Sequence, residues 1–326
     1  MTGRSGVSVA LASYNGERFI GHQLESIASQ VLPPDEVVLS DGGSSDRTVE
    51  IATAFFAAHP VLNGRVIADG ARLGVTPNFE RAILATTGRL IALSDQDDVW
   101  TPDRLRLAAA AFDEHDVLVV HSDARLVDLE GAPLGLRLYE ALGVHDAELS
   151  ALAGPTAFAT LIRRNLVTGA TAMIRRDLLD VAVPFPASWV HDEWLAMIAA
   201  ATGRLLPLRD ELIDYRQHGG NEIGVVASTL RYRLGRMVQP RGQHYRRLAV
   251  RAAELSARLE SLDVDVDAVW RELAFRKQRF EERRAAYPRH RIARLAPVLR
   301  NTGGRSYSTM SSQGRLDIVR DLVQPS

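Results

Sequence analysis

The sequence predicts an α/β fold, a mostly parallel, Rossmann-like β-sheet flanked by helices, followed by a basic helical region. Two observations lead to this fold class. Up to about residue 120, short runs of apolar and β-branched residues alternate with segments that carry apolar residues at helical spacing. That alternation is typical of a parallel sheet with helical crossovers. Beyond residue 224 the pattern becomes helical throughout and rich in arginine.

The charge of the chain divides at the same point. Residues 225–326 contain 21 Lys and Arg against 10 Asp and Glu, a formal charge of +11, whereas residues 1–224 contain 18 against 30, a formal charge of −12. We therefore expect one domain over 1–224 and a basic α-helical region over 225–326. The acidic part suits a cation. The basic part suits an anionic partner such as a membrane surface, but solvated helices or a surface that docks on the acidic part would have the same composition.

Composition excludes several classes of site. The chain has no cysteine, so disulfides, thiolate zinc sites and cysteine nucleophiles are excluded. Its 46% hydrophobic and 24% charged residues are normal for a globular protein. No apolar run approaches the ~20 residues of a membrane span, and we expect no signal peptide, because the first residues are polar.

The elements of the first part follow from apolar runs and the turn residues between them. Val7–Ala12 is a β-rich run that ends in the turn residues Ser13 to Gly16. Thr76-Pro77 and Thr101-Pro102 each combine an N-cap residue with proline at the first helical position. The other expected strands are 36–40, 65–68, 90–93 and 117–120, and the expected helices are 17–30, 48–58, 76–86 and 101–114.

The rest of the chain is less regular. Residues 132–166 give no clear pattern, whereas Thr168–Ile174 indicates a tight loop and a strand. A helix is expected to open at Trp189 to Asp192 and to run to residue 202. Short strands are expected over 205–208 and 212–215, and basic helices over 226–238, 243–261, 267–286 and 313–323.

An acidic loop follows the predicted strand 90–93. Residues 94–100 read Ser-Asp-Gln-Asp-Asp-Val-Trp, which places the carboxylates of Asp95, Asp97 and Asp98 at the C-terminal end of a buried strand. Ligands bind at that edge in open α/β sheets. Because the three carboxylates repel one another, one interpretation is a divalent metal that carries a phosphorylated substrate, and the other is a solvated acidic turn.

Seven motifs in this order resemble glycosyltransferase family 2. The resemblance covers residues 5 to about 224. Ser-Asp-Gln-Asp-Asp-Val-Trp and Tyr-Arg-Gln-His are typical of its bacterial rhamnosyltransferase-like branch. The motifs are Val-Ser-Val-Ala-Leu-Ala-Ser-Tyr-Asn-Gly at 7–16, residues 40–48, Arg-Leu-Gly at 72–74 with Asn-Phe-Glu-Arg-Ala at 78–82, residues 94–100 with Pro102-Asp103, Thr-Gly-Ala at 168–170, His-Asp-Glu-Trp at 191–194 and Tyr-Arg-Gln-His-Gly-Gly-Asn at 215–221.

The resemblance implies a GT-A fold, a nucleotide-diphosphate sugar donor, a Mg²⁺ or Mn²⁺ ion and inversion at the anomeric carbon. It implies that Asp97 is the principal metal ligand and that Asp95 faces the ribose or the metal. It also suggests His218 as a further metal ligand, although a loop histidine that binds backbone or acceptor remains the alternative. The positions implied at the donor site are Ala12, Tyr14, Asn15, Glu17, Asp41, Arg72 and Asp95.

Asp192 matches the catalytic base of the family. The acceptor hydroxyl has a pKa far above neutral, so a carboxylate must take its proton in the transition state, while a metal neutralises the departing diphosphate. Glu193 is its neighbour at i+1 and does not share its face of a helix. A carboxylate that only stabilises the N-terminus of the helix is the alternative role for Asp192.

The chain departs from the family pattern after the second strand. The family usually has paired aspartates there, whereas this chain has Asp41 followed by Gly42. The contact to the nucleobase is therefore expected from Asp41 or from a different group. Tyr14 either stacks near the base or packs as a half-buried core residue.

The expected activity is inverting transfer of a sugar, L-rhamnose from a dTDP donor by branch resemblance, to a hydroxyl of a glycan or lipid-linked acceptor. A nucleotidyltransferase is one alternative, but its first loop would carry a basic residue, and here Glu17 stands there without a lysine. A catalytically inactive relative that binds a nucleotide or glycan is the other, favoured by Gly42. We expect a cytoplasmic protein in peripheral contact with the inner face of the membrane through residues 225–326, no nucleic-acid partner, and leave a homodimer open.

Overall fold

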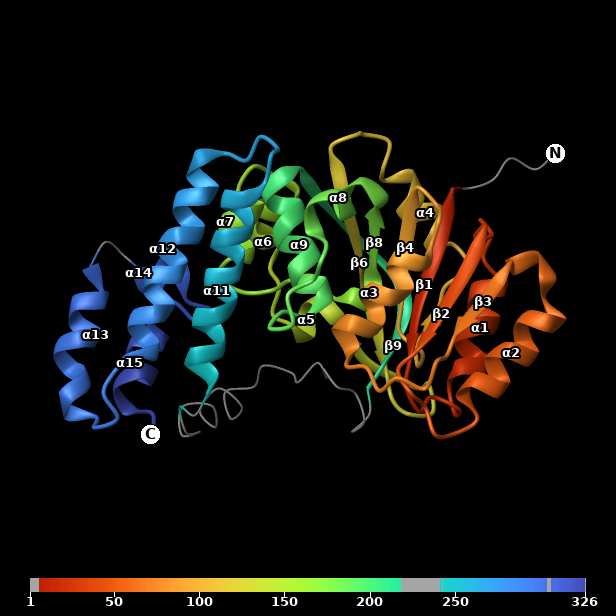
Figure 1. Ribbon diagram of the computed structural model, residues 1–326, viewed down its shortest axis with the longest axis horizontal. Helices are drawn as coiled ribbons and strands as arrows, with labels where there is room; N and C mark the ends of the chain where they lie inside the picture. The colour runs from red at the N-terminus through yellow and green to blue at the C-terminus, as the bar shows by residue number, and fades with distance from the viewer. Residues whose placement is uncertain (1–5, 218–240, 242, 304–305, 326) are drawn as a thin grey trace. The chain divides into compact units, whose positions relative to one another are not determined.

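The computed structural model describes residues 6–217, 241, 243–303 and 306–325. The chain divides into two compact units, one made of residues 1–154 with 167–226, the other of 155–166 with 227–326 (Figure 1). The boundary expected after residue 224 and the helix expected over 226–238 lie outside the described residues. The segment 155–166, which the sequence left unassigned, belongs to the second unit.

The first unit is built on a nine-stranded sheet within the described residues, with strand order β3-β2-β1-β4-β8-β6-β9-β5 and β7 paired to β6. β1 (Val7–Ser13) runs parallel to β2 (Glu36–Asp41) and β4 (Leu90–Ser94). β8 (Ala172–Arg175) is antiparallel to both of its neighbours. The remaining strands are β3 (Gly64–Ile67), β5 (Val99–Trp100), β6 (Val117–Val127), β7 (Pro133–Arg137) and β9 (Arg204–Arg216).

Helices cover both faces of this sheet, which explains why β1 is buried along its whole length and shows no polar alternation. Val7, Val9 and Leu11 share a core cluster with residues of α1, α2 and α4, whereas α3 packs on β1 and β2 and contacts α9. The helices of the unit are α1 (Ile20–Ala28), α2 (Thr48–Ala58), α3 (Val75–Ala85), α4 (Arg104–Ala110), α5 (Leu138–Ala141), α6 (Asp146–Ala153), α8 (Leu179–Ala182) and α9 (His191–Thr202), with short 3-10 turns η1 (Pro60–Leu62), η2 (Gly169–Thr171) and η3 (Arg176–Leu178).

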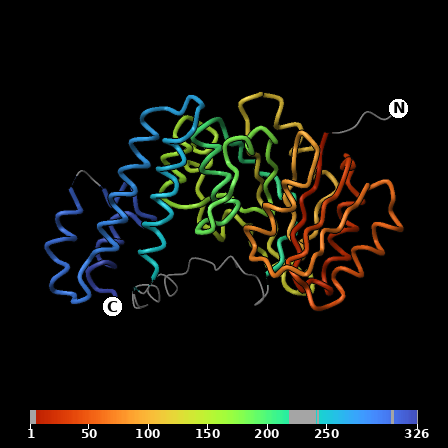
Figure 2. The backbone as a smooth tube through the Cα atoms, viewed as in Figure 1, coloured from red at the N-terminus to blue at the C-terminus, as the bar shows by residue number. Residues whose placement is uncertain are grey.

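The predicted α/β class is confirmed, but the last strand of the first unit differs from the prediction. The two short strands expected near residues 205 and 215 form the single long strand β9, which follows β6 with register shifts. Its polar residues Arg209 and Glu211 lie in the middle, and they pair with Asp146 and Arg137. Because these polar side chains are paired, the polar residues between the two predicted strands are part of β9 and do not end it. Figure 2 traces the first unit from red at β1 to blue-green at β9.

Strand direction brings the predicted site loops together. Ser13 at the end of β1 pairs with Asp41 at the end of β2, and Leu11 pairs with Ser94 at the end of β4. The loops that follow these three parallel strands therefore leave the sheet at the same edge, as expected for a ligand site in an α/β sheet.

The second unit is helical in its described part. Its core contains Phe280, Tyr287, Val298, Tyr307 and Met310. Its elements are α7 (Ala157–Leu161), α11 (His244–Ser261), α12 (Ala268–Ala285), η4 (Ile292–Arg294), α13 (Leu295–Asn301), α14 (Ser306–Met310) and α15 (Leu316–Val323). α13 and α14 had not been expected from the sequence.

A buried ion cluster joins α12 to α15. Arg284 lies 2.8 Å from Asp321 and 3.1 Å from Glu281, and all three side chains are buried. Burial raises the pKa of Asp321, but the Arg284 charge and hydrogen bonds from Arg284, Tyr245 and Tyr307 outweigh burial and hold that pKa below its usual range. The cluster is therefore ionised and mutually satisfied.

We expect Arg284→Met to destabilise the second unit by about 3–5 kcal/mol, because it leaves two buried carboxylates without their shared cation. Amide hydrogen exchange of the α12 and α15 peptides across a urea series measures this loss. Arg279→Met is the matched control, because Arg279 is exposed and its pair with Glu282 is a surface pair worth less than about 1 kcal/mol. Equal exchange in both variants would contradict a structural role for the cluster.

Candidate functional site

The acidic loop after β4 holds a carboxylate that the fold does not satisfy. Asp98 is buried, and its Oδ1 accepts a hydrogen bond from the Arg216 backbone N at 3.1 Å. Its Oδ2 has no hydrogen-bond partner among the described residues. Burial, together with the charges of Asp97 and Asp95, raises the pKa of Asp98 well above its usual range. A buried acceptor without a partner is costly unless something binds it.

Asp95 carries the same excess of negative charge. Its removal from water and the charges of Asp97 and Asp192 raise the pKa of Asp95 to about 8. Arg104 opposes the rise. Asp192 of α9 and the acidic loop are therefore electrostatic neighbours, although nearly a hundred residues separate them in sequence.

Arg104 is a buried cation behind the carboxylates. Its Nη2 donates to the carbonyl oxygens of Leu93 at 2.9 Å and Ala170 at 2.7 Å, and its guanidinium lies 3.5 Å from the centroid of the Trp100 ring. Burial lowers the pKa of Arg104 to about 9, while Asp98 and Asp95 act in the opposite direction. One guanidinium thus offsets part of the charge of the loop.

Asp192 is the second residue of α9 and is fixed by backbone donors. Its Oδ2 accepts from the Gly169 N at 2.9 Å and its Oδ1 from the Glu193 N at 2.6 Å. Residue 169 must be small, because an added Cβ would lie 2.7 Å from His191 Nε2 and 3.3 Å from Asp192 Cβ. The Thr-Gly-Ala segment therefore sets the position of the predicted base.

His191 does not compete for the role of base. Its ring is buried and stacks on Phe79, with centroids 3.8 Å apart and an interplanar angle of 18°. Burial lowers the pKa of His191 to about 3, so the ring is neutral at physiological pH. Its contribution is packing beneath the first turn of α9.

A glutamine joins the loop after β1 to the acidic loop. The Gln96 side chain accepts from the Tyr14 N and donates to the Tyr14 O, both at 2.9 Å. An added Cβ on Gly16 would lie 2.1 Å from Gln96 Oε1, so this close approach requires glycine. The residue between the aspartates of the motif Asp95-Gln96-Asp97 is therefore a structural link.

The loop after β2 uses its aspartate internally. Asp41 is buried, and its Oδ2 accepts from the Gly43 N at 3.0 Å and the Ser44 N at 2.8 Å. An added Cβ on Gly42 would lie 3.2 Å from Asn78 Nδ2 and 3.3 Å from the Leu73 O. The space beside Gly42 is already filled by neighbouring atoms.

The other predicted donor residues lie around the same loops. Ala12 is at the end of β1 opposite Ser40. Asn15 has a positive φ of 47° and accepts from the Ser45 N, and Glu17 accepts from the Arg47 N. These two side chains hold the first loop to the second. The side chain of Tyr14 is exposed, and the Arg72 guanidinium lies 5.6 Å from its ring centroid. His218 lies outside the described residues.

Sequence reasoning missed the role of Arg216. Its buried side chain donates from Nε to the Asp97 O at 2.8 Å and from Nη1 to the Leu129 O at 2.8 Å and the Asp128 O at 3.2 Å. It thereby ties the acidic loop to the turn after β6. The adjacent Tyr215 is also buried. Its burial and the charges of the same carboxylates raise the pKa of Tyr215 well above its usual range. The only sequence signal was their place in the Tyr-Arg-Gln-His motif.

The donor set suits a hard cation. Among residues 6–217 and the other described ranges, no group of three or more His, Cys, Asp or Glu side chains is arranged to hold a metal. The unpartnered Asp98 Oδ2 and the raised pKa of Asp95 nevertheless indicate that the described residues do not compensate ionisation of these carboxyl groups, which a bound cation would favour. Oxygen ligands favour Mg²⁺ or Mn²⁺ over soft metals.

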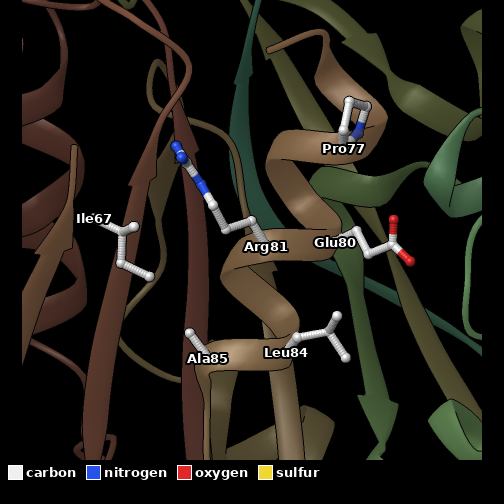
Figure 3. Close-up of a pocket in the computed structure, with 6 residues that line it drawn as sticks. All are labelled: Ile67, Pro77, Glu80, Arg81, Leu84 and Ala85. Atoms are coloured by element: carbon white, nitrogen blue, oxygen red, sulfur yellow. The ribbon is translucent and has the colours of Figure 1, made fainter. Parts of the chain in front are cut away.

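A separate hollow of about 490 Å³ lies between β3 and α3. It is lined by Ile67, Pro77, Glu80, Arg81, Leu84 and Ala85 (Figure 3). None of these six residues belongs to the predicted site. Arg81 instead supports the loop after β2, because its Nε donates to Ser40 Oγ at 2.7 Å and its Nη2 donates to the Asp41 O.

Comparison with known proteins gives a family match and distant relatives. The model of glycosyl transferase family 2 matches residues 8–181. An uncharacterized glycosyltransferase of a Nostoc species is 25% identical over 226 residues, which is 66% of each chain. A dTDP-rhamnosyl transferase of Shigella flexneri is 33% identical over 101 residues, 30% of this chain and 35% of that protein. The chain thus spans no more than about two thirds of the length of either curated relative.

Solved structures share the fold. Staphylococcus aureus TarS 1-349 in complex with UDP-GlcNAc has a TM-score of 0.62 at 19% identity and covers 97% of this chain and 88% of its own. The mannosyltransferase PcManGT of Pyrobaculum calidifontis, in complex with GDP-Man and Mn²⁺, has a TM-score of 0.57 at 19% identity and covers 93% and 76%. These similarities confirm the expected GT-A fold.

We expect Arg216→Met to loosen the acidic loop, because three carbonyl oxygens lose charged donors worth about 1.5–3 kcal/mol each at most. Amide hydrogen exchange of the peptide that contains residues 95–100 should rise at least tenfold. Arg125→Met is the control. Arg125 lies on the neighbouring stretch of β6 and pairs with Asp214 as a half-exposed ion pair. An unchanged exchange rate in Arg216→Met would show that the loop holds its position without the guanidinium.

Proposed function

This chain belongs to glycosyltransferase family 2, and from that premise we propose that it transfers a sugar from a nucleotide-diphosphate donor to an acceptor hydroxyl, with inversion at the anomeric carbon. The observation that carries the proposal is the set of carboxylates at one edge of the sheet. Asp95, Asp97 and Asp98 follow β4, and Asp192 lies near enough to help raise the pKa of Asp95.

We assign Asp97 and Asp95 to the donor diphosphate. They would hold a Mg²⁺ or Mn²⁺ ion, which when bound supplies Lewis-acid neutralisation of the charge on the diphosphate. The complexes of TarS with UDP-GlcNAc and of PcManGT with GDP-Man and Mn²⁺ support a nucleotide-sugar donor and a divalent metal. His218 remains a candidate for a further ligand.

Asp192 serves as the general base in this proposal. The acceptor hydroxyl attacks the anomeric carbon as the nucleoside diphosphate leaves, and Asp192 takes the hydroxyl proton in the same step. The hydrogen bonds from the Gly169 and Glu193 amides fix the carboxylate for this task. Burial lowers the pKa of His191 to about 3, which disfavours a protonated ring, and the ring stacks on Phe79, so we give His191 no part in the proton transfer.

Tyr14 and Arg72 take the exposed end of the donor site. We assign the nucleobase to this pair, because the Asp41 carboxylate is engaged by the backbone of its own loop and residue 42 has no carboxylate. Ala12, Asn15 and Glu17 shape the loops that surround the nucleotide.

L-Rhamnose from a dTDP donor is the sugar that we propose. The motifs at 94–100 and 215–218 and the partial similarity to a dTDP-rhamnosyl transferase support it. The acceptor is a glycan or a lipid-linked hydroxyl. We propose that the basic residues 225–326 bring the enzyme to the inner face of the cytoplasmic membrane, where a lipid-linked acceptor would lie. Among the helices of the described residues, none has the length and apolarity needed to cross a membrane.

Purified protein should release nucleoside diphosphate from a nucleotide sugar in a Mn²⁺-dependent reaction, and Asp192→Asn should reduce transfer by about 10²–10⁴-fold while donor binding persists. Mass spectrometry of products across a donor panel measures both. Glu193→Gln is the control for the neighbouring charge and should keep most of the activity. Pyrophosphate as the product would indicate a nucleotidyltransferase instead, and donor binding without turnover would indicate an inactive relative.

Asp97→Ala should weaken donor binding itself, because the metal ion that neutralises the diphosphate would lose its principal protein ligand. Calorimetric titration with nucleoside diphosphate, with and without Mn²⁺, should show that the gain in affinity from Mn²⁺ is lost. Asp103→Ala is the matched control, since Asp103 is a half-exposed aspartate that pairs with Arg106. A full Mn²⁺ effect in Asp97→Ala would remove Asp97 from the metal site.

A further inference from the structure

The last helix of the second unit, α15, buries charged side chains and exposes aliphatic ones. α15 buries Asp317, Arg320 and Asp321, which are 0–7% exposed. It exposes Leu316, Val319 and Val323, which are 44–57% exposed. An amphipathic helix that packs on a core does the reverse. The informative departure from the usual pattern is the combination of buried charge with exposed aliphatic side chains.

The buried face of α15 is fixed by its partners. Asp321 accepts hydrogen bonds from Arg284 Nε at 2.8 Å, Tyr245 OH at 2.7 Å and Tyr307 OH at 2.8 Å. Rotating the helix to bury its aliphatic residues would leave Asp321 and Arg284 without these contacts, at high cost. The aliphatic side chains of α15 are therefore held outward by the ion cluster.

A second stripe of the same kind lies on η4 and α13. Ile292, Leu295 and Leu299 recur at i, i+3 and i+7 and are 52–80% exposed, so they share one helix face. α13 contacts α15, and buried Arg294 donates from Nη1 to the Gln324 O at 2.6 Å just after α15 (Figure 1). We call Ile292, Leu295, Leu299, Leu316, Val319 and Val323 together the aliphatic stripe.

The exposed charged residues on the elements that carry the aliphatic stripe have one sign. Residues 283–316 contain no Asp or Glu, and Asp317 and Asp321 are buried. Arg291, Arg300 and Arg315 are exposed on the same three elements or directly beside them. Exposed aliphatic residues among arginines, without an exposed carboxylate, match the headgroup region of an anionic bilayer.

We propose that the aliphatic stripe inserts into the interfacial layer of an anionic lipid membrane, with the flanking arginines on the lipid phosphates. This inference rests on the proposed function, because the proposed function supplies the membrane that would carry a lipid-linked acceptor. Charge favours lipid over a second copy of this chain. A two-fold contact through the stripe would bring like-charged arginines of both copies together.

Co-sedimentation of the full chain with vesicles tests the proposal. The chain should bind vesicles of phosphatidylcholine with phosphatidylglycerol and bind pure phosphatidylcholine at least tenfold more weakly. The double variant Leu295→Ser with Leu299→Ser should lose at least tenfold in binding to the anionic vesicles. The double variant Leu316→Ser with Val323→Ser, on α15, should lose binding to the anionic vesicles to a similar extent. Because all four positions are exposed, unchanged circular dichroism is expected to accompany the loss.

A matched control lies on α11. Val250→Ser removes a 50% exposed aliphatic side chain outside the stripe, and this variant should bind vesicles as the unaltered chain does. The proposal would be overturned if the stripe variants bound anionic vesicles as strongly as the unaltered chain. It would also be overturned if the substitutions left vesicle binding unchanged and only reduced dimerisation, as measured by sedimentation velocity. Vesicle binding is measured without donor. Failure of sugar transfer alone would thus refute the proposed function, and failure of stripe-dependent binding alone would refute this inference.

Discussion

Repulsion among carboxylates is the constraint around which the first unit is organised. Parallel strands carry the acidic loop to one edge of the sheet, and the N-terminus of α9 adds Asp192. Charges at this spacing in a partly desolvated place oppose one another, and the raised pKa values of Asp95 and Asp98 express that opposition. Arg104 relieves part of it from behind. The repulsion that Arg104 does not relieve favours binding of a cation, and we propose that this cation carries the donor diphosphate.

The loops at this edge are held by contacts that span the sequence. Gln96 fastens the acidic loop to Tyr14, and Arg216 fastens it to the turn after β6. The Asp41 carboxylate accepts hydrogen bonds from the backbone of its own loop. Such contacts leave few groups at the edge that are not already occupied by structure. The exposed side chains of Tyr14 and Arg72 and the Asp98 Oδ2 are among those few in the described residues, and our proposal places the donor at this edge for that reason.

Local sequence patterns predicted the first half of the sheet well, because β1, β2 and β4 are buried along their whole length and each contains a short apolar run bounded by polar or turn residues. The acidic loop was found because its three carboxylates are adjacent in sequence. Arg104 and Arg216 were not found, because they act by donating to backbone carbonyls as far as 119 residues away. A carbonyl has no sequence signature. The inverted α15 was hidden for a related reason. Its amphipathic pattern predicts a helix, but only the position of Arg284 decides which face is buried.

The most direct test of the central claim is a crystal structure of the protein with Mn²⁺ and an unreactive analogue of its nucleotide-sugar donor. The account predicts an anomalous manganese signal on the carboxylate of Asp97, next to the donor diphosphate, with Asp192 facing the anomeric carbon from the opposite side. Manganese bound elsewhere, or an Asp192 carboxylate remote from the anomeric carbon, would contradict it.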